Sequence, residues 1–297
     1  MNPEGAHQPP WEDLGRLVAT ALAEDLPAGD PTGESVGARQ AQADLVARRA
    51  GCACGLVAAE LVLDEVSRKL HTGVVDVRLR AADGDEVRAG QVLALFAGPA
   101  DALLAGERTM LNLIAHLSGV ATATRAMVEA VAGTGAVIRD TRKTLAGFRA
   151  AEKYAVRCGG GANHRMSLSD AVLVKDNHVA AMGGVTAAVA AAKLVAAGTS
   201  PPLDVEVEVD DLTELDEALA AGAELVLVDN MPTDAIAEAV RRAHARGAKV
   251  EASGGVTLGT VRAVAECGVD YIAVGSITHS AGALDVALDW RFGPLSQ

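Results

Sequence analysis

The chain has 297 residues, half of them hydrophobic, but only three Phe, two Tyr and two Trp. This length is sufficient to bury a core of small aliphatic side chains without disulfides or a structural metal. The net charge of -13 disfavours nucleic acid as a partner, because phosphate binding needs a basic surface. The four cysteines form no C-x-x-C pair, which indicates buried free thiols in a reducing compartment and not a zinc site.

The apolar runs are short and interrupted by Gly, Asp or Arg, whereas a membrane span needs about 20 consecutive apolar residues. The N-terminal sequence MNPEGAHQPP is polar and Pro-rich, and it lacks the basic start and apolar core of a signal peptide. We therefore expect a cytoplasmic protein that does not contact a membrane. Its N-terminal residues are expected to form a short disordered segment.

The first part of the chain predicts an N-terminal α+β domain. Residues 74–98 alternate around an Asp83-Gly84 turn and predict a β-hairpin that resembles those of biotinyl and lipoyl carrier domains. Because no lysine stands at its tip, we assign this hairpin a structural role. Apolar spacing also predicts helices over 11–24, 56–70 and 103–132, a strand over 42–50, and a loop of acids, Pro and Gly over 24–35.

After the long helix, six apolar β-rich runs alternate with Ala-rich helical stretches. Strands that alternate with helices form parallel βαβ units, and near-continuous apolar strands are typical of a parallel sheet covered by helices. This pattern favours an irregular TIM-like β/α barrel, with a doubly wound sheet as the alternative. The expected strands are Ala136–Asp140, Ala171–Lys175, Val205–Val209, Leu225–Asp229, Lys249–Ser253 and Tyr271–Gly275.

The fold class is therefore α/β, with two domains. We expect an N-terminal α+β sandwich domain over 1–118 that caps a barrel and is rejoined by 283–297. The C-terminal β/α barrel is expected over 119–282, and it is predicted to carry the chemistry, because barrel active sites lie at the carboxyl ends of the strands.

Cationic residues gather at the first two strand ends and in the loop between them. Arginine binds carboxylate or phosphate as a two-pronged fork, and lysine acts as a point charge. So many cations in an acidic chain predict a small polyanionic ligand, although solvated surface charge is the alternative. The residues are Arg142, Lys143, His164, Arg165 and Lys175, with Thr141 beside them.

Two acidic residues, Glu208 and Asp229, end neighbouring strands and are expected to face the same mouth. Hard oxygen ligands of this kind suit Mg²⁺ held together with substrate oxygens. They could instead bind sugar hydroxyls, stabilise positive charge in a transition state, or pair with the nearby lysines. Glu206 is a weaker candidate for the same face.

Glycine-rich segments follow the last two predicted strands. Ser253, Gly254 and Gly255 form one of them, and Gly275, Ser276 and Ile277 form the other. Glycine lets main-chain N–H groups approach an anion, and barrels often bind phosphate at these late loops. A third segment, CGGGANHR at 158–165, predicts either a flexible lid or a close backbone approach.

The stretches DTRKT, GGGANHR, LVKDNH, VEVEV, LVDN, EASGG and AVGSITHS, in this order, resemble the quinolinate phosphoribosyltransferase family. The resemblance covers nearly the whole chain, including EDLPAGDPT and ERTMLNLIAHLSGVAT. It implies that quinolinate attacks the anomeric carbon of phosphoribosyl pyrophosphate with Mg²⁺ present, giving nicotinate mononucleotide, pyrophosphate and CO₂ in NAD synthesis. It further implies that CO₂ loss follows quaternisation of the ring.

The resemblance also implies roles for particular residues. Quinolinate would be surrounded by Arg108, Arg142, His164, Arg165 and Lys175. Lys143 would reach the phosphorylated substrate, Glu208 and Asp229 would hold ribose hydroxyls and metal, and the glycine segments would hold the 5′-phosphate. In the family the N-terminal domain of one subunit caps the barrel of another, so a homodimer with Arg108 acting in trans is implied. Lys143, Lys175, Glu208 and Asp229 are the expected catalytic residues.

The chain departs from the family pattern at one loop, where Leu145-Ala146 replaces Thr-Pro. Losing the proline frees a main-chain torsion, which predicts a less rigid loop. Three rival functions remain: a paralogous phosphoribosyltransferase acting on another base, a Schiff-base aldolase using Lys175, and a non-catalytic binding protein.

Overall fold

The computed structural model describes residues 9–37 and 39–291. The expected N-terminal disordered segment thus lies mostly outside the described residues. The chain divides into two compact units, one comprising 1–125, 144–160 and 278–297, and the other comprising 126–143 and 161–277. Segment 144–160 was expected in the barrel, whereas its contacts group it with the N-terminal unit.

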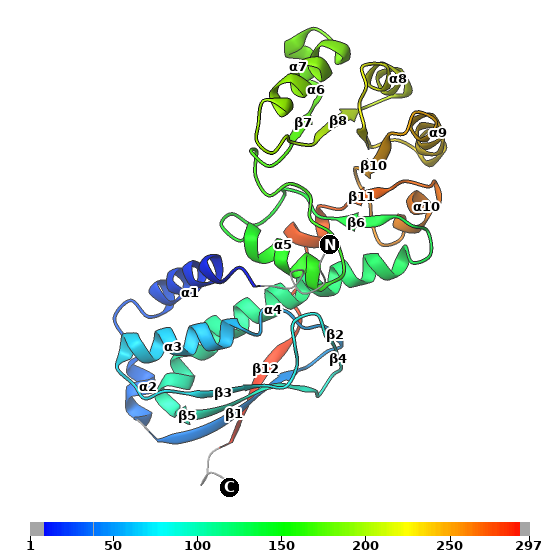
Figure 1. The fold of residues 1–297 in the computed structure, drawn as a ribbon. Helices are drawn as coiled ribbons and strands as arrows, with labels where there is room; N and C mark the ends of the chain where they lie inside the picture. The colour runs from blue at the N-terminus through cyan, green and yellow to red at the C-terminus, as the bar shows by residue number, and fades with distance from the viewer. Residues whose placement is uncertain (1–8, 38, 292–297) are drawn as a thin grey trace. The chain divides into compact units, whose positions relative to one another are not determined.

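The first unit is an antiparallel sheet of order β12-β1-β5-β3 with helices α3 and α4 packed over it (Figure 1). Alternating burial along β1 places Ala41, Ala43 and Leu45 in the core, which is what a strand with one covered face requires. The elements are α1 (Trp11–Asp25), α2 (Pro31–Val36), β1 (Gln40–Ala47), β2 (Gly51–Cys52), α3 (Ala58–Leu70), β3 (Asp76–Leu79), β4 (Glu86–Val87), β5 (Val92–Pro99), α4 (Ala100–Ala130), α5 (Arg149–Cys158) and β12 (Val286–Arg291).

Two local expectations for this unit need correction. Helix α2 occupies part of the stretch expected to be a loop, because the Asp30 side chain caps it by accepting from Thr32 N–H and Pro31 suits the first turn. The hairpin over 74–98 is also more elaborate than expected. Strands β3 and β5 do pair antiparallel, but the segment between them carries β4, which pairs with β2.

The first unit holds three buried free cysteines, Cys52, Cys54 and Cys158, as expected, while Cys267 in the other unit is partly exposed. Burial raises the pKa of the Cys52 thiol to about 11, so this thiol is protonated at neutral pH. None of the four cysteines forms a disulfide.

Gly159, in the CGGGANHR segment, is a point of close backbone approach. A Cβ atom there would lie 2.5 Å from the Ala121 carbonyl oxygen and 2.6 Å from the Thr124 Cβ on helix α4. We expect Gly159→Ala to lower the free energy of unfolding by about 2 kcal/mol, because the added methyl forces these backbones apart.

Thermal unfolding of the purified variant measures this effect. Gly15→Ala is the matched control: Gly15 lies inside α1, and an added methyl there would meet no atom within 4 Å, so alanine should leave the midpoint unchanged or raise it slightly. An unchanged midpoint for Gly159→Ala would contradict the close approach.

The loop that departs from the family pattern retains an anchor. The Leu145 N–H donates to Glu152 Oε2 at 3.2 Å, and Glu152 is fully buried. The other oxygen of Glu152 lies 2.8 Å from His116 Nε2. A buried carboxylate therefore ties this loop to α5.

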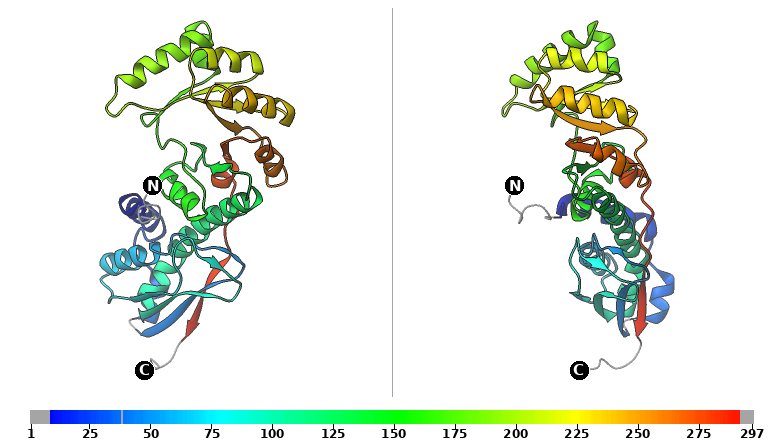
Figure 2. Two further views of the ribbon diagram at one scale, coloured as in Figure 1. Left: turned by 45° about the vertical axis from the view of Figure 1, so that its right-hand side comes forward. Right: turned by 90° about the vertical axis from the view of Figure 1, so that its right-hand side faces the viewer.

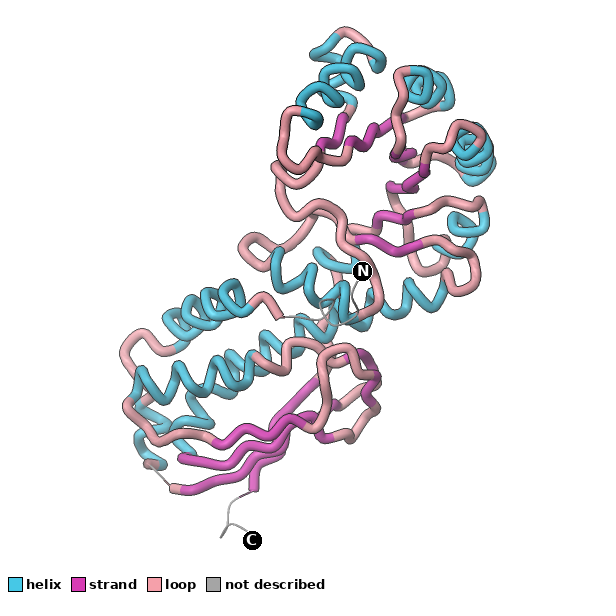
Figure 3. The backbone as a smooth tube through the Cα atoms, viewed as in Figure 1, coloured by secondary structure: helices cyan, strands magenta, loops and turns pink. Residues whose placement is uncertain are grey.

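The second unit is a six-stranded parallel sheet of order β6-β11-β10-β9-β8-β7, and it confirms the predicted β/α architecture. The strands curve around an interior, and helices lie on the outside (Figures 2 and 3). Among the described residues β6 and β7 do not pair, so the barrel is open between them. The elements are β6 (Val137–Arg139), β7 (Val172–Val174), α6 (Asp176–Met182), α7 (Val185–Ala197), β8 (Val205–Val209), α8 (Leu212–Ala220), β9 (Leu225–Asp229), α9 (Thr233–His244), β10 (Lys249–Ser253), α10 (Val261–Glu266), β11 (Tyr271–Ala273) and α11 (Ser276–His279).

Within the described residues, no helix taken alone has the length and apolar character to cross a membrane. In the same part of the chain, α6 and α7 counted together, across a bend of 100°, meet that criterion of length and composition.

Candidate active site

The carboxyl ends of the barrel strands enclose a pocket of about 350 Å³. Most of its polar lining was predicted from the strand ends, whereas its apolar lining was not. The lining residues are Thr141, Arg142, Lys143, His164, Arg165, Leu173, Lys175, Glu208, Leu227, Asp229, Glu251, Ser253 and Ala273.

Two guanidinium groups lie together at this pocket. Burial lowers the pKa of Arg165 and the positive charge of Arg142 lowers it further, while the negative charges of Glu206 and Asp170 oppose this fall. Like charges brought together in a partly buried site indicate an anionic ligand that would relieve their repulsion. The Arg165 guanidinium is oriented by donation from Nη1 to the Ala171 carbonyl at 3.0 Å.

Lys175 immediately follows β7, and its Nζ forms an ion pair with Glu208 Oε2 on the neighbouring strand β8. The Glu208 side chain is only 14% exposed and the Lys175 side chain 42% exposed, so the lysine reaches the opening of the pocket. The pair therefore places an ammonium group near the opening of the pocket and a carboxylate deeper on the same side.

The other predicted carboxylate, Asp229, ends β9 and lies in register with Ser253 on β10. Its Oδ2 accepts from Asn230 Nδ2 at 2.7 Å. Glu208 and Asp229 line the same pocket from adjacent strands, as expected. Carboxylates of this kind are hard oxygen donors that suit Mg²⁺, and a metal ion at this position stays a prediction.

The loop that carries His164 is fixed to the end of β6. The Asp140 carboxylate is fully buried and accepts from the His164 N–H at 2.9 Å and from Asn163 Nδ2 at 2.5 Å. Ala162 extends the sheet by a parallel bridge to Arg139. This anchoring explains how a residue from a glycine-rich loop reaches the pocket of a barrel.

The His164 ring engages the protein through both nitrogens. Nε2 lies 2.7 Å from Glu206 Oε2, and Nδ1 accepts from the Arg165 main-chain N–H at 2.7 Å. His164 lines the pocket as predicted, but these contacts show that its ring nitrogens face protein groups. A direct contact with substrate stays a prediction.

The first glycine segment makes a tight turn beyond β10. Gly254 and Gly255 adopt left-handed torsions, with φ of +94° and +60°. A Cβ at Gly254 would lie 2.7 Å from the Asn230 main-chain nitrogen, so only glycine fits there. Ser253 lines the pocket, which places this turn at its rim.

The remaining predicted residues do not line the pocket. Gly254, Gly255, Gly275, Ser276 and Ile277 lie in the second unit beyond the ends of β10 and β11. Arg108 is exposed on α4 in the first unit. Their roles in binding stay predictions.

Sequence reasoning missed Glu251 and the apolar floor of the pocket. Glu251 is fully buried within β10, and Leu173, Leu227 and Ala273 come from β7, β9 and β11. These three strands alternate in the sheet, and alternate strands supply one layer of a barrel interior. The alternation of a strand indicates that such residues point inward, but only the register shows which of them meet.

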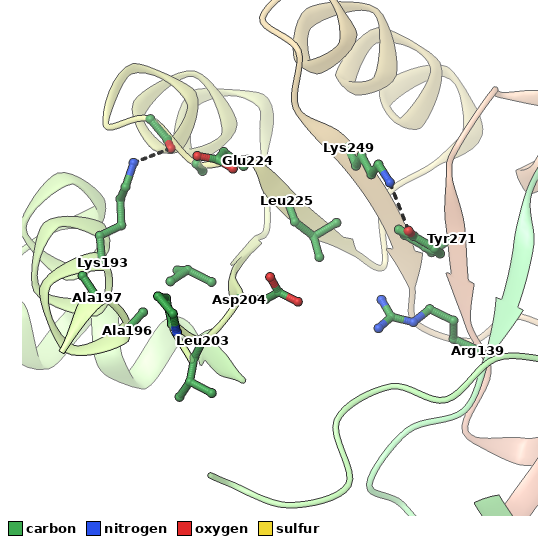
Figure 4. A pocket seen from close by; sticks show the side chains of 14 residues that line it. Arg139, Lys193, Ala196, Ala197, Leu203, Asp204, Glu224, Leu225, Lys249 and Tyr271 are labelled. Carbon is green, nitrogen blue, oxygen red and sulfur yellow. Dashed lines mark hydrogen bonds between the residues drawn. The ribbon is translucent and has the colours of Figure 1, made fainter. Parts of the chain in front are cut away.

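A larger cavity of about 500 Å³ lies at the opposite, amino ends of the strands. In Figure 4 Arg139 and Lys249 approach Tyr271, and the guanidinium carbon of Arg139 lies 4.7 Å from the centre of the tyrosine ring. The chemistry of barrel enzymes takes place at the carboxyl end, so we assign the smaller pocket as the active site.

Comparison with known proteins identifies the family. Residues 30–118 match the model of the quinolinate phosphoribosyl transferase N-terminal domain, and residues 120–289 match that of the C-terminal domain. The chain is 49% identical over 249 residues to the carboxylating nicotinate-nucleotide pyrophosphorylase of Mycobacterium leprae, covering 82% of this chain and 84% of that protein. It is 41% identical over 277 residues to a probable enzyme of the same name from Bacillus subtilis, covering 93% of each.

Solved structures agree with this comparison. The nicotinate-nucleotide pyrophosphorylase of Francisella tularensis superposes with a TM-score of 0.88 at 36% identity, covering 96% of this chain and 99% of that one. The enzyme from Ehrlichia chaffeensis gives a TM-score of 0.83 at 34% identity, covering 93% and 98%. The chain therefore belongs to the quinolinate phosphoribosyl transferase family.

Proposed function

We propose that this protein is a carboxylating nicotinate-nucleotide pyrophosphorylase that acts in NAD synthesis. The observation that carries the proposal is the pair of interacting guanidinium groups, Arg142 and Arg165, in one pocket with Lys175. Quinolinate is a dicarboxylate, and two arginines with a lysine provide the charge and the forked geometry that bind it. A base with a single carboxylate would engage fewer of these cations.

The reaction joins the quinolinate nitrogen to the anomeric carbon of phosphoribosyl pyrophosphate as the bond to pyrophosphate breaks. Glu208 and Asp229 would hold the ribose hydroxyls and stabilise positive charge on the sugar ring. Once the ring nitrogen is quaternary, it stabilises the electron pair left on the adjacent carbon when CO₂ departs. A proton then replaces the lost carboxylate.

Mg²⁺ fits the carboxylates that this pocket offers. Glu208 and Asp229 are hard oxygen donors on adjacent strands, although Glu208 already pairs with Lys175. An ion shared with the substrate needs only one or two protein carboxylates, directly or through water. When bound, Mg²⁺ would neutralise charge on the departing pyrophosphate.

The direct test is an assay with quinolinate, phosphoribosyl pyrophosphate and Mg²⁺ that follows nicotinate mononucleotide. The proposal expects product with quinolinate and none when nicotinate replaces it. Turnover with nicotinate or another base alone would support the paralogous phosphoribosyltransferase. Covalent trapping of Lys175 by borohydride with a carbonyl substrate would support the aldolase.

We also propose a homodimer in which Arg108 of one subunit completes the pocket of the other. Arg108 is exposed on its own unit, and a guanidinium there would add a third fork for the dicarboxylate. Mixing Arg108→Ala with Glu208→Ala subunits tests this, since each variant alone should be nearly inactive. If the arginine acts in trans, each mixed dimer contains one intact site. Re-association of an equal mixture should then restore up to about a quarter of the activity of the same amount of wild-type protein.

The control for this experiment is native mass spectrometry of the mixture, which measures the fraction of mixed dimers, because a mixture of Arg108→Ala with wild-type subunits gives half of the wild-type activity with or without exchange. No recovery in the exchanged Arg108→Ala and Glu208→Ala mixture would contradict action in trans.

We also propose a cytoplasmic location for the protein, because its buried free thiols suit a reducing compartment.

A further inference from the structure

Beneath the pocket lies a buried charged cluster that the proposed reaction does not use. Arg139, Glu206 and Glu251 come from β6, β8 and β10, which alternate in the sheet and so supply one interior layer. Arg139 Nη1 donates to Glu251 Oε2 at 2.5 Å. The Glu206 and Glu251 side chains are 5% and 0% exposed, whereas the Arg139 side chain is 17% exposed, so both carboxylates are buried.

The cluster ends on the His164 ring. Its Nε2 lies 2.7 Å from Glu206 Oε2 and 3.7 Å from Glu251 Oε1. Nδ1 accepts from the Arg165 main-chain N–H, and a main-chain N–H can only donate, so Nδ1 carries no proton. The ring proton is therefore on Nε2 and is donated to Glu206.

Arg165, which lines the pocket, is connected to the buried cluster through the His164 ring. Its main-chain nitrogen is held by the His164 ring and its guanidinium by the Ala171 carbonyl, so the side chain is fixed at both ends. A ring with the other tautomer would place an N–H against the Arg165 N–H, and the two donors would repel. With this geometry only the Nε2–H tautomer can accept from the Arg165 main-chain N–H.

Charge balance favours a proton over a metal ion in the cluster. The ligand atoms of His164, Glu206 and Glu251 lie within 4.8 Å of one another, which is a spacing that a cation could use. Arg139 already supplies positive charge there, and a divalent ion beside it would be repelled. Burial raises the pKa of Glu251 to about 7, and the charge of Glu206 contributes to this rise, so a proton can rest on this carboxyl group.

We propose that Glu206, supported by Glu251 and Arg139, is a positioning residue that holds His164 as its Nε2–H tautomer and thereby sets Arg165 for the substrate carboxylate. The inference rests on the proposed binding of a dicarboxylate by Arg165. His164 then affects substrate binding by holding the Arg165 main chain. The interior layer of Arg139, Glu206 and Glu251 thereby contributes to the specificity for quinolinate.

Kinetics of two Glu206 variants test the inference. Glu206→Ala removes the acceptor and should raise KM for quinolinate about 10- to 100-fold, the effect of losing a hydrogen bond to a charged group, while KM for phosphoribosyl pyrophosphate changes less than about 3-fold. Glu206→Gln retains a carbonyl that accepts from Nε2–H, so it should restore most of the quinolinate affinity. Glu224→Ala removes an exposed acid just before β9; this variant is the control and should match wild type.

Imidazole ¹⁵N spectra provide a readout that does not depend on turnover. The chain has seven histidines, and loss of one signal pair in His164→Gln assigns the ring of interest. Wild type and Glu206→Gln should show an unprotonated Nδ1 and a protonated Nε2, whereas Glu206→Ala should show a mixture of tautomers. These spectra also test the network if Glu206→Ala does not fold, because Glu206→Gln and wild type remain.

Three results would overturn the inference. The first is a wild-type His164 protonated at Nδ1. The second is a Glu206→Ala variant in which both KM values rise together or only kcat falls. The third is a stoichiometric metal ion that co-purifies with wild type and is lost in Glu251→Gln. Absence of any turnover of quinolinate by wild type would instead refute the proposed function, while the spectra would still report on the network.

Discussion

Lys175→Ala is expected to lower kcat/KM by about 10³-fold, and Glu208→Ala by a similar factor, because each removes a group aimed at the reacting charges. The ion pair between them means that either change also leaves an unmatched charge at the pocket wall. Because the two side chains act as one unit, the double variant should lose little more than either single variant. Steady-state kinetics for both substrates measure the three losses.

The fold should survive both changes. The Lys175 side chain is 42% exposed and lies beyond the end of β7, so its loss opens no cavity in the core. Lys193→Ala on helix α7 of the same unit is the control for removing a lysine, and it should retain wild-type activity. Retention of more than about a tenth of the activity by both single variants, with normal thermal unfolding, would exclude the catalytic roles assigned to this pair.

The positions of these two residues were predictable because two simple rules combine. A polar residue directly after an apolar run marks a strand end, and parallel strands of a barrel bring such ends together. Lys175 follows Val172–Val174, and Glu208 belongs to the next strand along the sheet. Their proximity follows from chain order and strand direction alone.

The interior polar layer was not predictable in the same way. Glu251 lies inside β10 between Val250 and Ala252, where it belongs to an apolar run and gives no sign of function. Its meeting with Arg139 and Glu206 depends on the stagger between strands that are not neighbours in the sheet. That stagger is set by packing and register, which a single sequence does not express.

The helix α2 shows the same limit on a local scale. Its residues Pro31–Val36 include Gly33 and a preceding run of acids, Pro and Gly that is typical of a loop. The cap by Asp30 and the proline in the first turn outweigh these weak propensities. The formation of such a short helix therefore depends on one or two hydrogen bonds, which the pattern of apolar and polar residues does not indicate.

Gly254→Ala should abolish most of the activity, with a loss of about 10²-fold or more in kcat/KM for phosphoribosyl pyrophosphate, since a displaced donor group at an anion site costs this much. Alanine would be strained at φ +94°, and its methyl would collide with the Asn230 main chain. Asn230 donates to Asp229, so the collision would move both the expected phosphate turn and a predicted catalytic carboxylate. Kinetics with each substrate varied in turn measure the loss.

Gly259→Ala separates this effect from a general loss of loop freedom. Gly259 lies a few residues further along the same connection, the nearest atom to an added methyl there is 3.9 Å away, and its φ lies outside the left-handed region. This variant should therefore behave as wild type. A Gly254→Ala protein with a normal KM for phosphoribosyl pyrophosphate would show that the turn does not hold the phosphate. If instead the loss appears with Gly254→Ala alone, the close packing of Gly254 on Asn230 couples the phosphate turn to the carboxylate at the end of β9.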